Sequence, residues 1–315
     1  MSIESVGLVS RKPTQKPIWK RIIQFRWMYV FLLPAIIWYA IFAYGPIYFL
    51  QIAFRDYKII RGVYGSEWVG FKFFEAMFTD NYFWTVLWNT LKISSLKLIF
   101  VAPSGLFLAL ILNEVFNKPF KGFVQSCAML PHFFSWVVIA SIMKEIFALS
   151  TGMVNEIISA FGGERIYFMV EKGWFLFLLI ASDVWESAGW NSIMFMAAIA
   201  AIPPDLYEAA SIDGATRGQQ LRHVTLPGIA NTIVIIMILK VGSVMDAGFG
   251  QIFNLYNDAV RDSVDIIDTY VYRMGILGSK YSASAAVGLF KNVINLILVL
   301  TVNHVAKMVG QETLF

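Results

Sequence analysis

Residues 27–50 read WMYVFLLPAIIWYAIFAYGPIYFL, a run of 24 residues without a charged side chain. About 20 apolar residues in a helix are enough to cross the hydrocarbon core of a bilayer. The apolar region of a cleaved signal peptide is only about 7 to 15 residues long, and no small-residue cleavage site follows this run. We therefore expect residues 27–50 to form a transmembrane helix that is retained in the mature chain.

The composition extends this conclusion to the whole chain. Hydrophobic residues make up 58% of the 315 residues and charged residues only 15%, with a mean hydropathy of +0.64. Soluble domains contain about a quarter charged residues, and disordered chains contain more. The composition therefore excludes both classes and indicates a membrane protein.

Five further apolar runs are long enough to span a membrane. One of them carries no charge, and each of the others carries one or two charged residues. Because the runs are long and apolar on every face, they are not the alternating strands of a β-barrel. The sequence therefore predicts an all-α polytopic membrane protein with six transmembrane helices. The five runs cover residues 86–112, 122–143, 174–202, 228–246 and 284–306.

The basic residues near the start of the chain predict its orientation. Positive charge beside the first span is held on the cytoplasmic side during insertion, so residues 1–26 are expected in the cytoplasm. Six spans return the tail, residues 305–315, to the same side. Without residues 1–26 the chain has 19 basic and 20 acidic residues, so its net charge of +4 comes from this one segment. The net charge therefore does not indicate a basic surface for a nucleic acid. The six basic residues are Arg11, Lys12, Lys16, Lys20, Arg21 and Arg26.

The connector between the fourth and fifth runs, residues 203–227, reads PPDLYEAASIDGATRGQQLRHVTLP. Its first two prolines can end one helix and open another, because proline is tolerated in a first helical turn. Asp213 and Gly214 form a turn dipeptide. We therefore expect a short helix over about 205–212, a sharp bend, and a second helical piece over about 215–223, both at the cytoplasmic surface. The final proline is expected to begin the next span.

This connector resembles the EAA loop of bacterial ABC importer permeases, whose pattern is EAA-x3-G-x9-I-x-LP. The match fixes seven positions over 20 residues, and only Val224, in place of Ile, departs from it. The resemblance implies that the loop couples the chain to an ATPase. The coupling residues that it implies are Glu208, Ala209, Ala210, Asp213, Gly214, Leu226 and Pro227.

Weaker motifs along the chain resemble sugar permeases of the maltose-type class and, within it, the subgroup that takes up complex oligosaccharides. The resemblance implies the type I ABC importer permease fold, with a permease core over residues 85–304 and the first helix added outside it. The motifs of the class lie at 89–91, 110–114, 130–131 and 185–191, and those of the subgroup lie at 67–71 and 131–136.

The same resemblance implies the partners of the chain. These are a second homologous permease, two ATPase subunits, an external solute-binding protein and an oligosaccharide, in a bacterial plasma membrane. ATP and Mg²⁺ would bind the ATPase, and this chain would bind no cofactor. In agreement, residues 275–280 lack the spacing of a phosphate-binding P-loop, and the three histidines lie far apart without a metal-ligand motif. We expect no enzymatic activity and no metal site.

Charged residues inside the spans are the candidates for a solute path. A charge in mid-bilayer costs at least about 2.5–3.5 kcal/mol, so such groups face a cavity, a partner or the interface. One helical face carries Asp183, Glu186 and Trp190. This face either lines the translocation path or takes part in an interhelical hydrogen-bond network. A sugar-binding site would combine amide and charged hydrogen-bonding groups with aromatic faces. The candidates are Asn89, Lys92, Asp183, Trp185, Glu186, Trp190, Asn191, Lys291 and Asn295.

A second acidic series lies in the outer connector 247–283. Asp258, Asp262, Asp265 and Asp268 are spaced by 4, 3 and 3 residues, which predicts one side of a helix. We interpret this side either as a solvated face or as a docking surface for an external partner.

Other functional classes are weighed against the importer. A permease of the same class for a non-sugar solute would share the loop at 203–227. An ion-coupled secondary transporter would show broken helices in inverted repeats, and no such halves are visible. A membrane-embedded enzyme would cluster its catalytic groups, whereas the intramembrane charges here are spread over five spans. Neither of the last two classes explains the EAA pattern.

Overall fold

The computed structural model describes residue 19 and residues 23–308, and this part of the chain is almost entirely helical. Its strands are limited to β1 (Arg55–Asp56) and β2 (Glu67–Trp68), which pair antiparallel. The chain divides into two compact units, residues 1–51 and 52–315. The predicted all-α class is confirmed.

The first apolar run forms a helical stretch, Arg26–Phe54, that is long and apolar enough to cross a membrane. It consists of α2 (Arg26–Trp38), the π-helical η1 (Tyr39–Tyr44), α3 (Gly45–Phe49) and the 3-10 turn η2 (Leu50–Phe54). None of the side chains of α2, η1 and α3 is buried, as expected for a helix surrounded by lipid.

Among the described residues, two more single helices could cross a membrane, and three bent helix pairs could each do so. Length and composition therefore allow between three and six spans, and the predicted six remains a prediction. The single helices are α6 (Asn81–Asn113) and α18 (Tyr281–Met308). The pairs are Lys118–Phe133 with Trp136–Ile146 at 101°, Lys172–Ala200 with Pro204–Ile212 at 69°, and Arg217–Gly228 with Ala230–Gly242 at 60°.

The bent pairs are built from nine helical elements, and short elements form the connectors. The nine are α7 (Lys118–Met129), η4 (Leu130–Phe133), α8 (Trp136–Ile146), α10 (Lys172–Ala200), α11 (Pro204–Ile212), α12 (Arg217–Gln220), η5 (Leu221–Thr225), α13 (Leu226–Gly228) and α14 (Ala230–Gly242). The connectors contain η3 (Ile59–Arg61), α4 (Gly62–Gly65), α5 (Lys72–Thr79), α9 (Met153–Ala160), α15 (Phe249–Leu255), α16 (Arg261–Val264), α17 (Ile267–Tyr272) and η6 (Arg273–Leu277).

The uncharged run 122–143 does not form the single helix that its length predicted. α7 passes into the 3-10 turn η4, and α8 starts again at 101° to it. Pro131 has no N–H to continue the α-helical ladder. Ser135 then caps α8 by accepting a hydrogen bond from the Val138 N–H at 3.4 Å. Proline and a capping serine thus break an apolar run that hydropathy alone reads as continuous.

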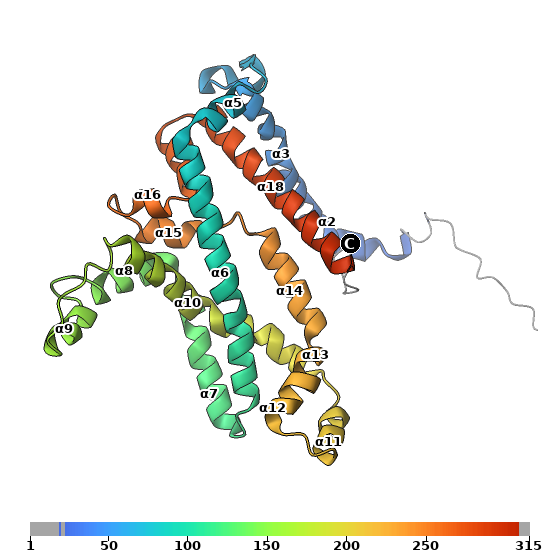
Figure 1. Cartoon of the computed structure of the whole chain (residues 1–315). Coiled ribbons are helices and arrows are strands. Elements are labelled where there is room, and N and C mark those ends of the chain that lie inside the picture. Colours follow the sequence, from blue (N-terminus) through green and yellow to red (C-terminus); the bar gives the residue numbers. More distant parts are fainter. Residues whose placement is uncertain (1–18, 20–22, 309–315) are drawn as a thin grey trace, which may run out of the picture. The chain divides into compact units, whose positions relative to one another are not determined.

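α10 lies against α6 and α7 at two glycines that allow close approach (Figure 1). A Cβ on Gly105 of α6 would lie 2.6 Å from the Cβ of Asn191. A Cβ on Gly189 of α10 would lie 2.0 Å from the Ala128 carbonyl oxygen of α7. Any larger residue would push α10 away, so these contacts fix the helix that carries the predicted path residues.

Buried apolar clusters hold the second unit together at several levels. One packs α8, α10 and α15 around Phe175, Leu179 and Ile252. Another packs α6, α10 and α14 around Phe195 and Ile236. Because α10 contributes to both, its position is set along its length by apolar contacts.

The orientation can be tested with single cysteines at exposed positions in a variant that lacks Cys127. Ile60, in the connector 51–85, is 100% exposed, and Ile212, at the end of α11, is 87% exposed. We expect Ile60→Cys to react with a membrane-impermeant maleimide in intact cells and Ile212→Cys to react only after permeabilisation. The Cys127→Ser parent controls for background, and the reverse pattern would overturn the predicted topology.

Candidate functional site

A cavity of about 400 Å³ opens beside α10 in the second unit. Asp183, Glu186 and Trp190, the predicted stripe, all line it, and so does Asn191. The structure therefore brings four of the nine candidates together on one wall. The other polar residues of the wall come from α10 itself, from α6, from η4 and from the end of α14 with the turn that follows it. They are Ser94, Lys97, His132, Ser187, Lys240, Ser243 and Asp246.

Lys97 and Asp183 form an ion pair in the wall. The Lys97 Nζ lies 2.7 Å from Asp183 Oδ2, and each side chain is only 15% exposed. Lys97 also donates to Gln251 Oε1 at 2.6 Å, and Gln251 Nε2 donates to the Leu179 carbonyl at 2.6 Å. This chain of contacts connects α6, α10 and α15, so it joins two long helices to the outer connector.

The backbone makes room for this ammonium. Gly248, between α14 and α15, has φ +94°, a left-handed conformation that glycine adopts without strain. A Cβ at this position would lie 2.5 Å from Lys97 Nζ. A glycine is therefore required both for the turn and for the approach of the lysine.

The break between α7 and α8 brings a histidine to the same wall. His132 Nδ1 lies 3.1 Å from Glu186 Oε1, and the imidazole stacks on the Trp190 indole with ring centroids 4.6 Å apart and an interplanar angle of 17°. Two residues of the predicted stripe are thus held by one side chain from another helix. Together the three residues present a flat aromatic face next to hydrogen-bonding groups.

Five of the predicted path residues do not line the cavity. Trp185 is half-exposed on another side of α10, because a two-residue offset from Asp183 rotates it by about 200° around the helix. Asn89 and Lys92 donate instead to backbone carbonyls of the outer connector, those of Asp262 at 2.9 Å and Ser263 at 3.4 Å. The geometry places these three outside the wall.

Lys291 and Asn295, on α18, do not line the cavity either, and they bond to residues of other elements. Lys291 forms ion pairs with Asp246 and, at 2.5 Å, with Asp268. Asn295 Oδ1 accepts a hydrogen bond from the Met245 N–H at 3.2 Å. Asp183, Glu186 and Trp190 therefore line a cavity, as a solute path requires. Lys291 and Asn295 instead take part in contacts between helical elements.

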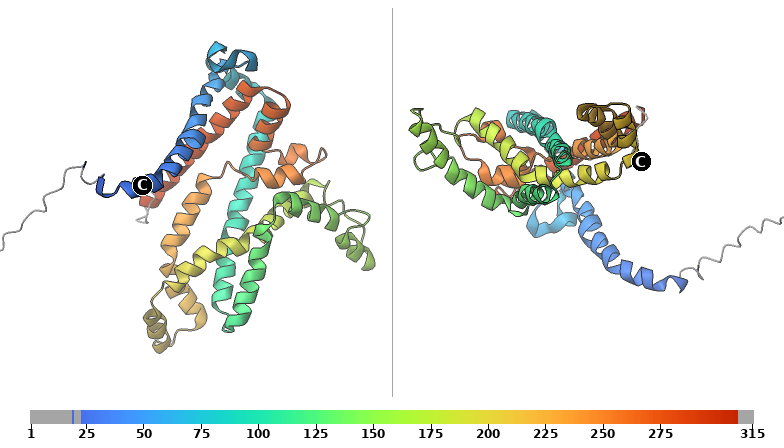
Figure 2. Two further views of the ribbon diagram at one scale, coloured as in Figure 1. Left: turned by 180° about the vertical axis from the view of Figure 1, so that it is seen from behind. Right: turned by 90° about the horizontal axis from the view of Figure 1, so that it is seen from below.

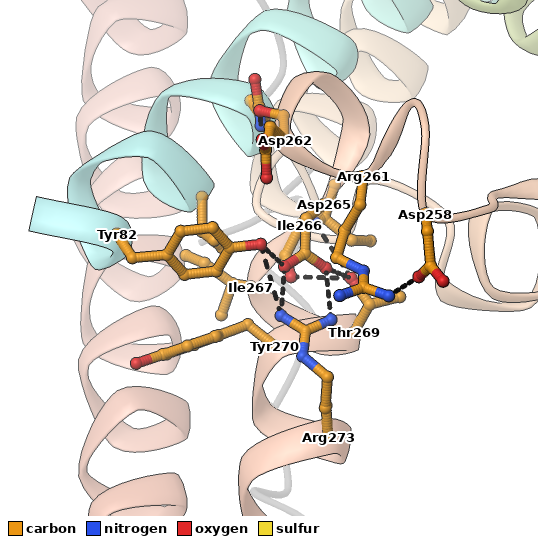
Figure 3. A network of polar contacts seen from close by, with 12 residues as sticks. Tyr82, Asp258, Arg261, Asp262, Asp265, Ile266, Ile267, Thr269, Tyr270 and Arg273 are labelled. Carbon is orange, nitrogen blue, oxygen red and sulfur yellow. Dashed lines mark hydrogen bonds and ion pairs between the residues drawn. The ribbon is translucent and has the colours of Figure 1, made fainter. Parts of the chain in front are cut away.

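The acidic series in the outer connector is not one helical face, and that prediction is wrong. α16 and α17 are separate helices, and Asp265 lies between them with a side chain only 1% exposed. Figure 3 shows its carboxylate facing the Arg273 guanidinium. The ion pair measures 2.5 Å, and Tyr82 and Thr269 donate to the same carboxylate at 2.7 and 2.6 Å. Sequence spacing could not reveal the backbone turn that buries this residue.

Electrostatics support this ion pair in the connector. The hydrogen bond to Asp265 is the main cause that raises the pKa of the Arg273 guanidinium above its ordinary value. Burial, with a hydrogen bond to Asp80 at 3.0 Å, raises the pKa of Tyr270 to about 12. Both groups therefore keep their protons at any physiological pH.

The predicted coupling loop has the expected helix, bend and helix. α11 ends at Ile212, and Gly214 follows with φ +78°. The Ala215 N–H donates to the Ala210 carbonyl at 2.9 Å, which closes the end of the helix. Glu208 and Ala209 are exposed.

The helical piece after the bend runs further than the sequence predicted. It extends through α12, η5 and α13 to Gly228, so Pro227 does not begin the next span. The break comes at Ile229, and α14 starts beyond it at 60°. Pro227 lies at the start of α13, where its missing N–H is tolerated.

Side-chain contacts brace the coupling loop on both sides of the bend. Tyr207 OH and Thr225 Oγ1 lie 3.0 Å apart, which joins α11 to η5. Arg217 pairs with Glu114 at 3.2 Å and lies over the Phe116 ring at 4.4 Å. The loop after α6 and the coupling loop thus lie together at one end of the second unit, as both views show (Figures 1 and 2).

Comparison with known proteins identifies the family. Residues 102–311 match the model of the binding-protein-dependent transport system inner membrane component. This match covers two thirds of the chain. The chain belongs to this family. The permease is therefore a membrane component of a binding-protein-dependent transport system.

Two relatives from Bacillus subtilis (strain 168) match over nearly the full length of the permease. The polygalacturonan/rhamnogalacturonan transport system permease protein YteP is 41% identical over 309 residues, covering 98% of the permease and 96% of YteP. Protein LplB is 42% identical over 290 residues, covering 92% and 91%.

Solved structures give the same result. A chain in the crystal structure of a bacterial alginate ABC transporter in complex with alginate pentasaccharide-bound periplasmic protein has a TM-score of 0.88 and 37% identity, covering 95% of the permease and 100% of that chain. The type I ABC importer permease fold and the sugar importer interpretation are confirmed. The homologues are transport subunits and not enzymes themselves.

Several residues of the cavity wall were not predicted as path residues. Lys97, Lys240 and Asp246 are charged residues of the apolar runs and Ser94 is a polar one, but sequence spacing does not connect any of them with the stripe. His132 is one of three histidines that lie far apart in the sequence. Its signal was the preceding Pro131, which breaks the helix and turns this side chain toward α10.

The ion pair between Lys97 and Asp183 predicts a stability effect that a double-mutant cycle can measure. Lys97→Met or Asp183→Leu alone leaves a charge without its partner, and we expect each to cost roughly 3–5 kcal/mol. The double variant should be less destabilised than either single variant. The measurement is the free energy of unfolding, or the Tm, of the purified permease in nanodiscs.

The exposed pair Lys58–Asp56, at 3.9 Å, is a matched control for this cycle. An exposed ion pair contributes about 0–1 kcal/mol, so its cycle should show almost no coupling. Equal coupling at the two pairs would contradict the role assigned to Lys97 and Asp183.

Proposed function

We propose that the permease is one of two different membrane subunits of an ATP-driven importer in a bacterial plasma membrane. It receives an oligosaccharide from an external solute-binding protein and passes it to the cytoplasm. Two ATPase subunits bind ATP and Mg²⁺ and drive the cycle. The crystal structure of the alginate relative, in complex with a periplasmic protein, supports the external partner.

The observation that carries this proposal is the direct connection between α10 and α11. α10 lines the cavity with Asp183, Glu186 and Trp190, and it ends at Ala200, only four residues before α11 begins at Pro204. An ATPase that moves α11 therefore displaces the end of the helix that forms the cavity wall. No flexible linker separates the two elements.

The contacts within the coupling loop allow α11 to transmit a displacement to the membrane helices. Tyr207 joins α11 to η5, and Arg217, on α12, joins the second half of the loop to the end of α6, so the loop and the end of α6 move together. Exposed Ala209 leaves a shallow surface that another protein can approach closely, and Glu208 beside it supplies a charge for orientation. We assign the docking surface to the exposed side of α11.

The cavity wall has the groups that an oligosaccharide needs. Trp190 offers an aromatic face for a sugar ring, and Glu186 and Asn191 offer acceptors and donors for hydroxyl groups. The second permease subunit would complete the path on the open side of the cavity. The names of the relatives, which include polygalacturonan, rhamnogalacturonan and alginate, support a saccharide as the solute.

Docking at α11 can be tested by size and by backbone conformation. Ala209→Trp should block the approach of the ATPase and weaken its association roughly tenfold or more, because overpacking costs about 1–3 kcal/mol. Gly214→Val should misalign α12, because φ is +78° there and a side chain costs about 1–2 kcal/mol in that region. The measurements are co-purification of the ATPase and sugar-stimulated ATP hydrolysis in the reconstituted complex.

The control for this experiment is Ala209→Ser, which keeps a small side chain and should retain both association and stimulation. Normal stimulation in Ala209→Trp and Gly214→Val would show that the loop is only a connector. Coupling would then run through residues 113–122 or the termini.

The path can be tested with two tryptophans of the same helix. Trp190→Phe should change the relative transport rates of oligosaccharides of different length, because Trp190 lines the cavity. Trp185→Phe should leave them unchanged, because that ring lies off the cavity. A contact of this kind contributes about 1–3 kcal/mol, so a change of about tenfold is expected in uptake by proteoliposomes. Equal effects of the two variants would contradict a path along this wall.

A further inference from the structure

The charged groups of the cavity wall are paired with one exception. The three carboxylates all have cationic or hydrogen-bonding partners, since Asp183 meets Lys97, Glu186 meets His132 and Asp246 meets Lys291. Lys240 also lines the cavity, in the last turn of α14. Its ammonium forms neither a hydrogen bond nor an ion pair with any residue in the part of the chain that the structure describes.

Two more donors on the same wall have no acceptor. Ser94 is buried, and its Oγ forms no hydrogen bond with the described residues. The Nδ2 of Asn191 is buried and unpartnered as well. Buried polar groups are nearly always satisfied, so these two atoms indicate a missing partner in the cavity.

The missing partner is therefore an acceptor. An ammonium, an amide N–H and a hydroxyl can all donate, and each carboxylate of the wall already has one cationic or hydrogen-bonding partner. A carboxylate satisfies an ammonium better than a neutral hydroxyl does, because a charge-assisted hydrogen bond is roughly twice as strong as a neutral one.

We propose that Lys240 is a specificity-determining residue that binds a carboxylate of an anionic oligosaccharide, a chain of uronate units. This proposal rests on the proposed function, because it assigns a charge to the solute of that cavity. Ser94 and Asn191 supply neutral hydrogen bonds to the same solute. The ion pairs of Lys97 and of Lys291 hold their carboxylates away from it and so reduce the repulsion of an anion.

The test uses the complete importer in proteoliposomes with its solute-binding protein. Uptake is measured for uronate di- to pentasaccharides and for neutral oligosaccharides of the same lengths, including the methyl esters of the uronates. The variants are Lys240→Arg, Lys240→Gln and Lys240→Glu. The control is Lys307→Gln, an exposed lysine at the end of α18 that does not line the cavity.

For the best transported uronate, we expect Lys240→Arg to keep most of the rate, Lys240→Gln to lose about tenfold, and Lys240→Glu to lose still more. The Lys307→Gln control should keep the wild-type rate. Transport of neutral sugars or esters should change less than twofold in Lys240→Gln. The ratio of acidic to neutral transport within each variant is the readout, so a general loss of activity does not imitate the effect.

Each other outcome overturns a distinct claim. Equal rates for Lys240→Gln and wild type on uronates, or equal losses on acidic and neutral sugars, would overturn the role of Lys240. Loss of the second permease from purified Lys240→Gln would show that a carboxylate of that subunit, and not the solute, is the partner. Wild-type transport of neutral sugars alone would overturn the anionic solute but keep the importer, and no sugar transport at all would overturn the proposed function.

Discussion

A charged side chain in an apolar span must find a partner, and this constraint organises the second unit. Lys97 meets Asp183 between α6 and α10, and Lys291 on α18 meets Asp246 and Asp268. Each pair joins elements that are distant in sequence. The apolar clusters bring the helices together, whereas the charged pairs select which faces meet, because an apolar face has no preference of its own in lipid.

Breaks in helices place the cavity where the pairs can form it. Pro131 interrupts one apolar run and presents His132 to α10, and Gly248 turns the chain against Lys97. A straight helix through either point would keep those side chains in lipid or at a helix interface. The irregular backbone is tolerated at these two points because it is packed against protein or lines the cavity.

The sequence predicted the helical class, the apolar runs and the helix, bend and helix of residues 203–227, since all of them depend on local composition or short spacing. It also placed Asp183, Glu186 and Trp190 on one face, because i, i+3 and i+7 positions align in any helix. It could not predict His132 on the same wall or the burial of Asp265 by Arg273, because both depend on backbone turns between distant segments. For the same reason, Asn89 and Lys291 looked like path residues but bond to connectors.

The outer connector and α11, at the two ends of α10, are held by different contacts. This difference would allow α10 to move at the end that is joined to α11. The outer connector is held by several buried contacts, among them the Asp265 ion pair and the bond from the Ile267 N–H to Thr90 Oγ1 at 2.9 Å. α11 has no buried residue, and its hydrogen bond to η5 is made by the partly exposed side chain of Tyr207. A displacement applied at α11 would therefore rotate α10 about its end at the outer connector. This rotation would widen or narrow the cavity that α10 lines. The stability of the outer connector is thus what would convert a displacement of the coupling loop into a change at the cavity wall.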